Sequence, residues 1–148
     1  MRAIELSRSS LGDIARGPFG CVVVRRNEIV GEATNEVLKL HDPTAHAEVQ
    51  AIRRAAETLG THELRECELY ASCEPCPMCL GAILWARIPT VYYAASSADA
   101  RSAGFDDDAF YRVLRNESAS GVVRTQAHQA EAAEVLRAWS KMPERIQY

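Results

Sequence analysis

Residues 68–85 read ELYASCEPCPMCLGAILW, and this stretch joins a β-rich run to an apolar segment through a loop of cysteines and prolines. The run at 68–72 predicts a short strand. The segment at 76–85 predicts a helix, because Pro77 is tolerated in a first helical turn. The chain has five cysteines, an odd number, and three of them lie in this loop. Such a cluster is typical of metal-binding or reduced thiols rather than of a disulfide framework.

On both sides of this stretch, strand-like and helix-like patterns alternate. Extended runs lie at 19–25, 29–34, 91–95 and 122–125, and helical patterns lie near the N-terminus, at 45–59, before 114 and at 129–142. This alternation predicts a layered α/β domain in which at least some strands pair in parallel. The chain has 148 residues, 47% of them hydrophobic, which is enough for one well-buried core and too little for two ordinary domains. We therefore expect residues 1–148 to form a single domain.

Charge and composition limit the kinds of molecule that the protein is expected to bind. The formal net charge is -3, whereas proteins that hold nucleic acid through its phosphates usually carry a basic excess. The basic pairs Arg25-Arg26 and Arg53-Arg54 are short and are expected to be solvated. The composition therefore favours a small-molecule substrate over nucleic acid. The N-terminus lacks the pattern of a secretory peptide, and no apolar run approaches the roughly 18 residues of a membrane span, so we expect a cytoplasmic protein without a membrane partner.

His46, Cys76 and Cys79 have the chemistry of a catalytic zinc site. Such a site takes three protein ligands and leaves the fourth position to water, and these residues supply one imidazole and two thiolates. The two cysteines are three residues apart at a helix start, so both can lie on one face. The positive end of the helix dipole favours their thiolate forms. Glu48, two residues after His46, can take a proton from the zinc-bound water without being a ligand.

Two other metal sites compete with this interpretation. A structural zinc site needs four protein ligands, and Cys73 is the candidate fourth, but that arrangement leaves Glu48 without a role. An iron–sulfur site is a second alternative, because Cys-x-x-Cys-x-x-Cys begins the bacterial ferredoxin run. The next ligand position of that run is Ile83, which cannot bind iron. The three-ligand site is therefore favoured, with Cys73 as a small buried residue.

His-x-Glu followed by Pro-Cys-x-x-Cys resembles the signature of zinc deaminases. The sequence is similar to the cytidine deaminase-like superfamily, and within it to bacterial guanine deaminases. The similarity runs through most of the chain between 17 and 108, over 17–20, Asn35, 42–48, 72–85, 93–95 and 103–107. It implies a three-layer α/β/α fold around a central five-stranded mixed sheet. It also implies Zn2+ as the cofactor, held by His46, Cys76 and Cys79.

The resemblance also implies roles for residues outside the metal site. Glu48 would be the proton shuttle, Asn35 would hydrogen-bond the bound base and Phe19 would line the ring pocket. Asp107 would lie near the amino group that is lost. Simpler alternatives stay open, since Asn35 can cap a turn and Phe19 can be core. Asp107 belongs to a run of three aspartates that can be a solvated loop or a helix cap, and Asp106 is the alternative functional residue within it.

Two further parts of the chain are expected to lie near the bound base. Backbone groups near Ala47 and Cys76 can contact the ring. The terminal Tyr148 resembles the terminal tyrosine of the family and is expected to lie near an active site in a homodimer. The alternative for Tyr148 is a frayed chain end.

The implied reaction is hydrolytic deamination of guanine to xanthine and ammonia, in which zinc-bound hydroxide attacks C2 and Glu48 moves the protons. A tRNA adenosine deaminase is the alternative within the superfamily. The net charge opposes it, as does Gly104-Phe105-Asp106-Asp107, where a Lys-Thr-Gly type of loop would be expected. Cytosine, guanosine-type nucleosides and aminotriazines stay open as substrates. The non-enzyme alternative is a zinc-stabilised binding module, in which Glu48→Ala would have no consequence.

Overall fold

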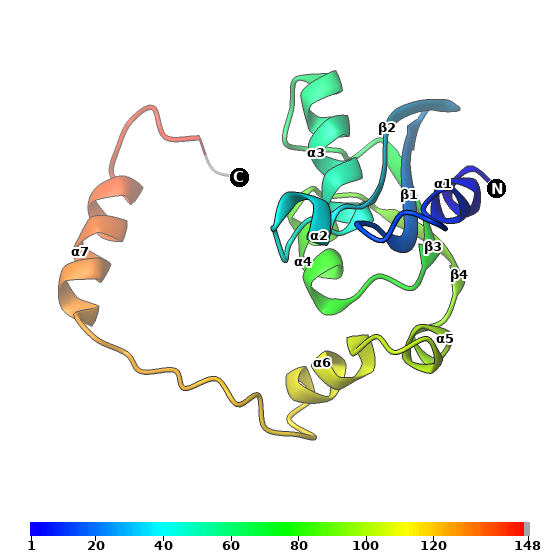
Figure 1. Ribbon diagram of the computed structural model, residues 1–148. Coiled ribbons are helices and arrows are strands. Elements are labelled where there is room, and N and C mark those ends of the chain that lie inside the picture. The colour runs from blue at the N-terminus through cyan, green and yellow to red at the C-terminus, as the bar shows by residue number, and fades with distance from the viewer. Residues whose placement is uncertain (147–148) are drawn as a thin grey trace. The chain divides into compact units, whose positions relative to one another are not determined.

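The computed structural model describes residues 1–146 (Figure 1). The chain divides into two compact units, Met1–Ser118 and Ala119–Tyr148. The first unit contains the sheet, and the second contains the helix α7, Gln129–Ser140. No helix within residues 1–146 is both long enough and apolar enough to cross a membrane. The assignment of 1–148 to a single domain remains a prediction.

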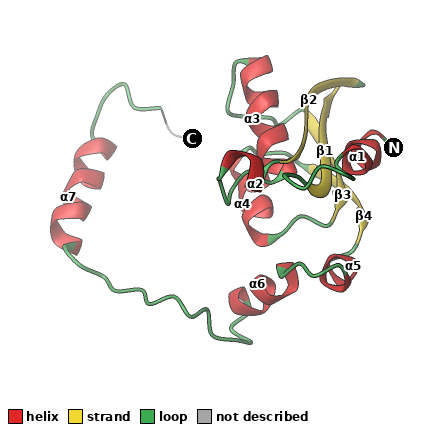
Figure 2. Ribbon diagram, in the orientation of Figure 1, coloured by secondary structure: helices red, strands yellow, loops and turns green. Residues whose placement is uncertain are grey.

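A mixed sheet forms the centre of the first unit (Figure 2). Its strands lie in the order β2 (Glu28–Asn35), β1 (Gly17–Arg25), β3 (Cys67–Cys73) and β4 (Thr90–Ala95). β1 is antiparallel to both of its neighbours, and β3 is parallel to β4. The mixed pairing confirms the fold class that the sequence predicts.

The described sheet has four strands, whereas five were predicted. The expected strand at 122–125 has no regular secondary structure and pairs with no other strand among the described residues. Val122 and Val123 are 69% and 89% exposed, so no ladder partner or packed face stabilises a strand. The prediction of a strand here was wrong because β-branched residues favour a strand only where a neighbour covers them.

Helices cover both faces of the sheet, which confirms the three-layer arrangement. α1 (Arg2–Ser9) packs against β1, and α3 (Ala47–Leu59) packs against β2. Two glycines allow these close contacts. A Cβ atom on Gly20 would lie 2.3 Å from the Ala3 carbonyl, and one on Gly31 would lie 2.4 Å from the Ala51 carbonyl. Gly31 pairs with Val23, three residues after Gly20 on β1, so the two helices lie on opposite faces.

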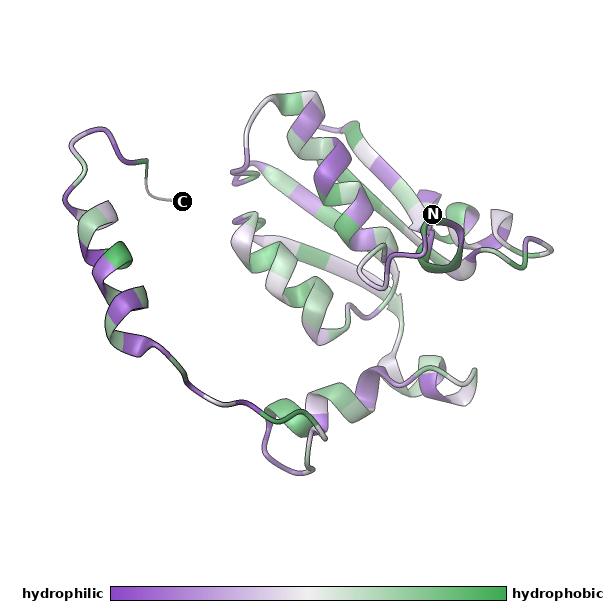
Figure 3. Ribbon diagram, turned by 60° about the vertical axis from the view of Figure 1, so that its left-hand side comes forward, coloured by the Kyte–Doolittle hydropathy of each residue, from purple (hydrophilic) through white to green (hydrophobic). Residues whose placement is uncertain are grey.

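The remaining helices of the first unit are α2 (Val37–Leu40), α4 (Pro77–Trp85), α5 (Ser97–Ser102) and α6 (Asp107–Leu114). α4 reads PMCLGAILW and is apolar along its whole length (Figure 3). It follows β3 and contacts α3. The metal-binding motifs therefore stand at the starts of two neighbouring helices.

Candidate active site

His46 and Glu48 are fixed by the start of α3. His46 is the N-cap residue in an extended conformation, and Glu48 lies in the first turn. The loop before them is tied down locally, because the Asp42 carboxylate accepts hydrogen bonds from the Thr44 amide and hydroxyl at 2.8 and 2.7 Å. The Ala45 carbonyl accepts a hydrogen bond from the Glu36 amide at 2.9 Å. The last of these bonds joins the residue before His46 to the residue that follows β2.

Cys76 and Cys79 are placed by the start of α4. Cys76 is the N-cap residue, Pro77 occupies the first turn and Cys79 is completely buried. The Sγ atoms lie 3.6 Å apart, and His46 Nδ1 lies 3.6 Å from Cys76 Sγ and 3.5 Å from Cys79 Sγ. A tetrahedral zinc with ordinary bond lengths separates such ligand atoms by about 3.6–3.8 Å. The three atoms therefore fit three corners of a zinc tetrahedron.

Mutual hydrogen bonds shift the pKa values of the three ligands in different directions. The hydrogen bond with Cys79, and then that with the His46 ring, lowers the pKa of the Cys76 thiol. The hydrogen bond with Cys76 raises the pKa of the Cys79 thiol. The hydrogen bond with Cys76 also raises the pKa of His46. Within residues 1–146, the only grouping of His, Cys, Asp and Glu side chains compact enough for a metal ion is His46, Cys76 and Cys79. Cys73 Sγ instead donates to the Ser96 carbonyl at 3.5 Å, so the geometry does not supply a fourth protein ligand.

A cavity of about 450 Å³ opens beside these ligands. Such a volume is within the range of small-molecule sites. Six of the residues predicted from the sequence line it: Phe19, Asn35, His46, Glu48, Cys76 and Asp107. Glu48 is 8% exposed, and burial raises the pKa of its carboxyl. A carboxyl with a raised pKa next to a metal site is suited to both accepting and donating a proton.

Asn35 ends β2 and meets the cavity beside Gly17, its partner in the sheet. A Cβ atom on Gly17 would lie 3.1 Å from Asn35 Oδ1, so a larger residue at this position would push the Asn35 side chain by a few tenths of an ångström. Asn35 Oδ1 accepts a hydrogen bond from the Val37 amide at 3.2 Å. The residue therefore caps the following turn, which was one of its two predicted roles, and its Nδ2 atom remains the donor that can meet a ligand.

Two aromatic rings form one wall of the cavity. Phe19 and Phe105 meet edge to face, with ring centroids 4.7 Å apart. Phe19 also packs against the hydrophobic core, so both predictions for this residue describe its surroundings. Phe105 was not among the predicted site residues, although it belongs to the segment 103–107 that carries the family resemblance. Arg16 also lines the cavity and was missed, because no local motif marks it.

Asp107 begins α6 and faces the cavity, whereas its neighbour Asp106 is exposed and is not among the lining residues. Burial raises the pKa of the Asp107 carboxyl, and the charge of Cys76 raises it further. Ala47 lies in the hydrophobic core, and its backbone contact with a ligand stays a prediction. Tyr148 lies outside the described residues.

The comparisons with known proteins agree with this geometry. The family model for the cytidine and deoxycytidylate deaminase zinc-binding region matches residues 1–95. The guanine deaminase of Bacillus subtilis (strain 168) is 51% identical over 113 residues, which cover 76% of this chain and 72% of that protein. An X-ray structure of guanine deaminase from Bacillus subtilis superposes with a TM-score of 0.92 at 42% identity, covering 99% of this chain and 94% of that one.

A tRNA-specific adenosine deaminase from Aquifex aeolicus (strain VF5) is 46% identical over 78 residues, 53% of this chain and 52% of that protein. His46, Cys76 and Cys79 all lie within the matched region, and their geometry fits zinc. The chain belongs to the cytidine and deoxycytidylate deaminase zinc-binding family and is a zinc-dependent aminohydrolase.

Proposed function

We propose that this protein hydrolyses guanine to xanthine and ammonia. The observation that carries the proposal is the likeness to guanine deaminase from Bacillus subtilis along nearly the whole chain, with a TM-score of 0.92. The match to the adenosine deaminase from Aquifex aeolicus covers about half of the chain, 53%. The cavity supports the proposal, because it joins the metal ligands to an aromatic wall and to polar groups that can hydrogen-bond a purine.

His46, Cys76 and Cys79 would hold zinc, which when bound would supply a water activated at neutral pH. Glu48 can accept a proton from that water, because its buried carboxyl lines the same cavity as His46 and Cys76. The same carboxyl can pass protons to the ring nitrogen next to C2 and to the departing amine. Its raised pKa serves the second half of this cycle, in which it must act as an acid.

The other lining residues would hold the base. Phe19 and Phe105 offer aromatic surface to the ring, and Asn35 Nδ2 can donate to an acceptor atom on the base. The Asp107 carboxyl faces the cavity and would orient the amino group that is lost. Backbone groups near Ala47 would complete the contacts with the ring.

The proposal is tested by incubating zinc-loaded protein with guanine, guanosine, cytosine, adenine, an aminotriazine and a tRNA anticodon stem-loop, and by measuring ammonia. Guanine is expected to release ammonia with an equal amount of xanthine. Release from the stem-loop and not from guanine would replace this proposal with RNA editing by the same metal chemistry. Zinc binding without release from any of them would favour a zinc-stabilised binding module.

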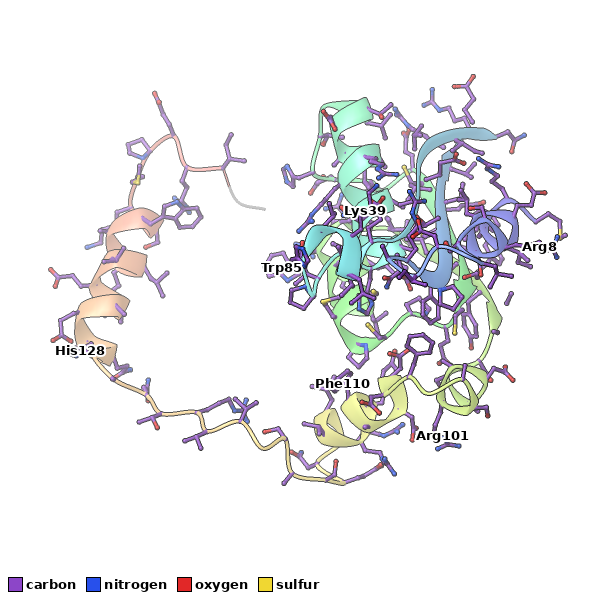
Figure 4. The ribbon with its side chains drawn as sticks, in the orientation of Figure 1. Arg8, Lys39, Trp85, Arg101, Phe110 and His128 are labelled. Carbon is purple, nitrogen blue, oxygen red and sulfur yellow. The ribbon has the colours of Figure 1, made fainter. Side chains whose placement is uncertain are left out.

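We also propose a homodimer with Tyr148 near an active site. α4 is apolar on every side, which is typical of a helix covered all round. Nevertheless its side chains Leu80, Leu84 and Trp85 are exposed, and Figure 4 labels Trp85. A second copy of the chain would cover them. Sedimentation equilibrium should give twice the chain mass for the wild type and the chain mass for Leu84→Glu. Deletion of residues 145–148 should lower turnover, and unchanged turnover would remove Tyr148 from the site.

The single domain over residues 1–148 and a cytoplasmic location complete the proposal. All five cysteines are free, and zinc-binding thiolates persist best in a reducing compartment. Cell fractionation tests the location, and recovery of the activity with secreted or membrane material would contradict it. A single cooperative unfolding transition is expected for one domain, and two separate transitions would contradict it.

A further inference from the structure

The helix that carries Asp107 is held loosely to the rest of the first unit. None of the residues of α6 is fully buried. Its ion pair with α5 joins Arg101 to Asp108 at 3.0 Å, but the Arg101 side chain is 60% exposed, and such exposed pairs contribute little (Figure 4). The placement of the Asp107 carboxyl must therefore depend on a small number of other contacts.

Tyr111 provides a hydrogen bond from α6 to the metal-binding loop. Its hydroxyl donates to the Pro75 carbonyl at 2.7 Å. Pro75 is buried and directly precedes Cys76, the N-cap residue of α4 and a zinc ligand. The bond therefore ties α6 to a part of the chain that the metal site itself holds in place.

Tyr111 and Asp107 lie on the same face of α6. They are four residues apart, and residues at this spacing are neighbours on a helix surface. The face that donates to the Pro75 carbonyl is thus the face that directs Asp107 into the cavity. The ring of Phe105, just before the helix, meets Phe19 and holds the other side of the same segment. Loss of the Tyr111 hydroxyl would remove the hydrogen bond between α6 and the metal-binding loop and leave this aromatic contact in place.

We infer that Tyr111 is a positioning residue, which holds the Asp107 carboxyl at the reacting amino group through its hydrogen bond to the metal-binding loop. The inference rests on the proposed role of Asp107 in the deamination. Tyr111 itself is not among the residues that line the cavity. Its effect on turnover should therefore pass through Asp107, and an unchanged zinc content would show that it does not pass through the metal-binding loop.

Tyr111→Phe removes the hydroxyl and keeps the ring, so the test disturbs packing little. A typical hydrogen bond corresponds to roughly a 2- to 12-fold effect, and we expect kcat to fall by about that factor. KM should change less than about 2-fold, because the contact acts on orientation and not on binding of the ring. The zinc content should equal that of the wild type. Tyr92→Phe is the matched control, since Tyr92 is half exposed on β4 and should show no change.

A double-mutant cycle with Asp107→Asn separates positioning from an independent structural role. If Tyr111 acts through Asp107, adding Tyr111→Phe to Asp107→Asn should cost nothing more. Equal, multiplying losses in both backgrounds would overturn the inference, as would a Tyr111→Phe enzyme with unchanged kcat or with lost zinc. The cycle is measured on whichever base the wild type deaminates. Inactivity of the wild type toward guanine would thus refute the proposed substrate while the cycle still tests Tyr111.

Discussion

The two halves of the active site are built differently. The metal half consists of His46, Glu48, Cys76 and Cys79, which stand at the starts of α3 and α4, two helices that contact each other. The substrate half includes Phe105 and Asp107 in and before α6, a helix without a fully buried residue. Core packing thus fixes the metal geometry, whereas a few side-chain contacts fix the group that would select the base. Substitutions in the two halves should therefore impair the enzyme differently, through metal binding and chemistry in one half and through the placement of the base in the other.

The largest effect is expected when a metal ligand is removed. Cys79→Ser should lose zinc and reduce turnover by at least about three orders of magnitude, because the activated water depends on the metal. Zinc per chain, measured by mass spectrometry of the metal, and ammonia release give the two readouts. Cys73→Ser is the matched control and should keep one zinc and most activity. Loss of zinc from the control would favour the alternative in which Cys73 is the fourth ligand of a structural zinc site.

The second effect separates chemistry from metal binding within the metal half. Glu48→Gln keeps the size of the side chain but cannot shuttle protons, and general acid–base groups are typically worth about 100- to 10,000-fold. We expect kcat to fall by that range while zinc content and melting temperature stay near those of the wild type. Glu57→Gln, on the exposed side of the same helix, should behave like the wild type. Full activity of Glu48→Gln would show that Glu48 is not the proton shuttle.

In the substrate half, Phe105→Leu should weaken binding rather than chemistry. The substitution removes the edge-to-face contact with Phe19, and such pairs contribute about 0.5–1.5 kcal/mol beyond their area. We therefore expect KM for the base to rise roughly 2- to 12-fold with kcat nearly unchanged. Phe110→Leu is the control, because Phe110 is exposed on α6 and does not line this cavity. A large fall in kcat at constant KM would mean that the aromatic wall contributes to the chemical step and not to binding of the base.

The smallest effect is expected on the opposite face of the sheet, at the Arg2–Glu32 pair. Arg2 Nη2 donates to the Glu32 carboxylate at 2.7 Å and joins α1 to β2. This hydrogen bond lowers the pKa of Glu32 in the folded state below its unfolded value. The pair therefore stabilises the fold above the unfolded pKa, and the stabilisation is lost as the pH falls through the folded pKa.

Arg2→Gln should accordingly lower the melting temperature slightly at neutral pH and not at all in acid, as for most surface pairs. Turnover and zinc content should not change. A difference from the wild type that grows on acidification would contradict the expected direction of the pH dependence, and a loss of activity would couple this face of the sheet to the site.

The metal half was predictable from sequence because its spacings are local. Cys76-x-x-Cys79 and His46-x-Glu48 sit at helix starts that breakers and prolines mark, and the predicted starts of both helices lie within two residues of the observed ones. α5 was missed although Ser96 and Asp99 form a capping box, a signal that is visible in the sequence. The sequence patterns therefore predicted the two helices whose first turns carry the metal ligands.

The contacts of the substrate half were harder to predict from the sequence. Phe105 reaches Phe19 across 86 positions, and Tyr111 reaches Pro75 across 36, so no local pattern reports either contact. The role of Asn35 likewise depends on its pairing with Gly17 in the sheet. The strand expected at 122–125 failed for the same reason, since a strand requires a partner that propensity alone does not supply.

Hydrolytic deamination of guanine is best tested by turnover of guanine in water enriched in ¹⁸O, followed by mass spectrometry of the purine product and measurement of ammonia. Attack of the activated water on C2 predicts one ¹⁸O atom at C2 of each xanthine and one ammonia per xanthine, with both absent for Glu48→Gln over the same time. Unlabelled xanthine, label at another carbon, or turnover without ammonia would contradict this chemistry.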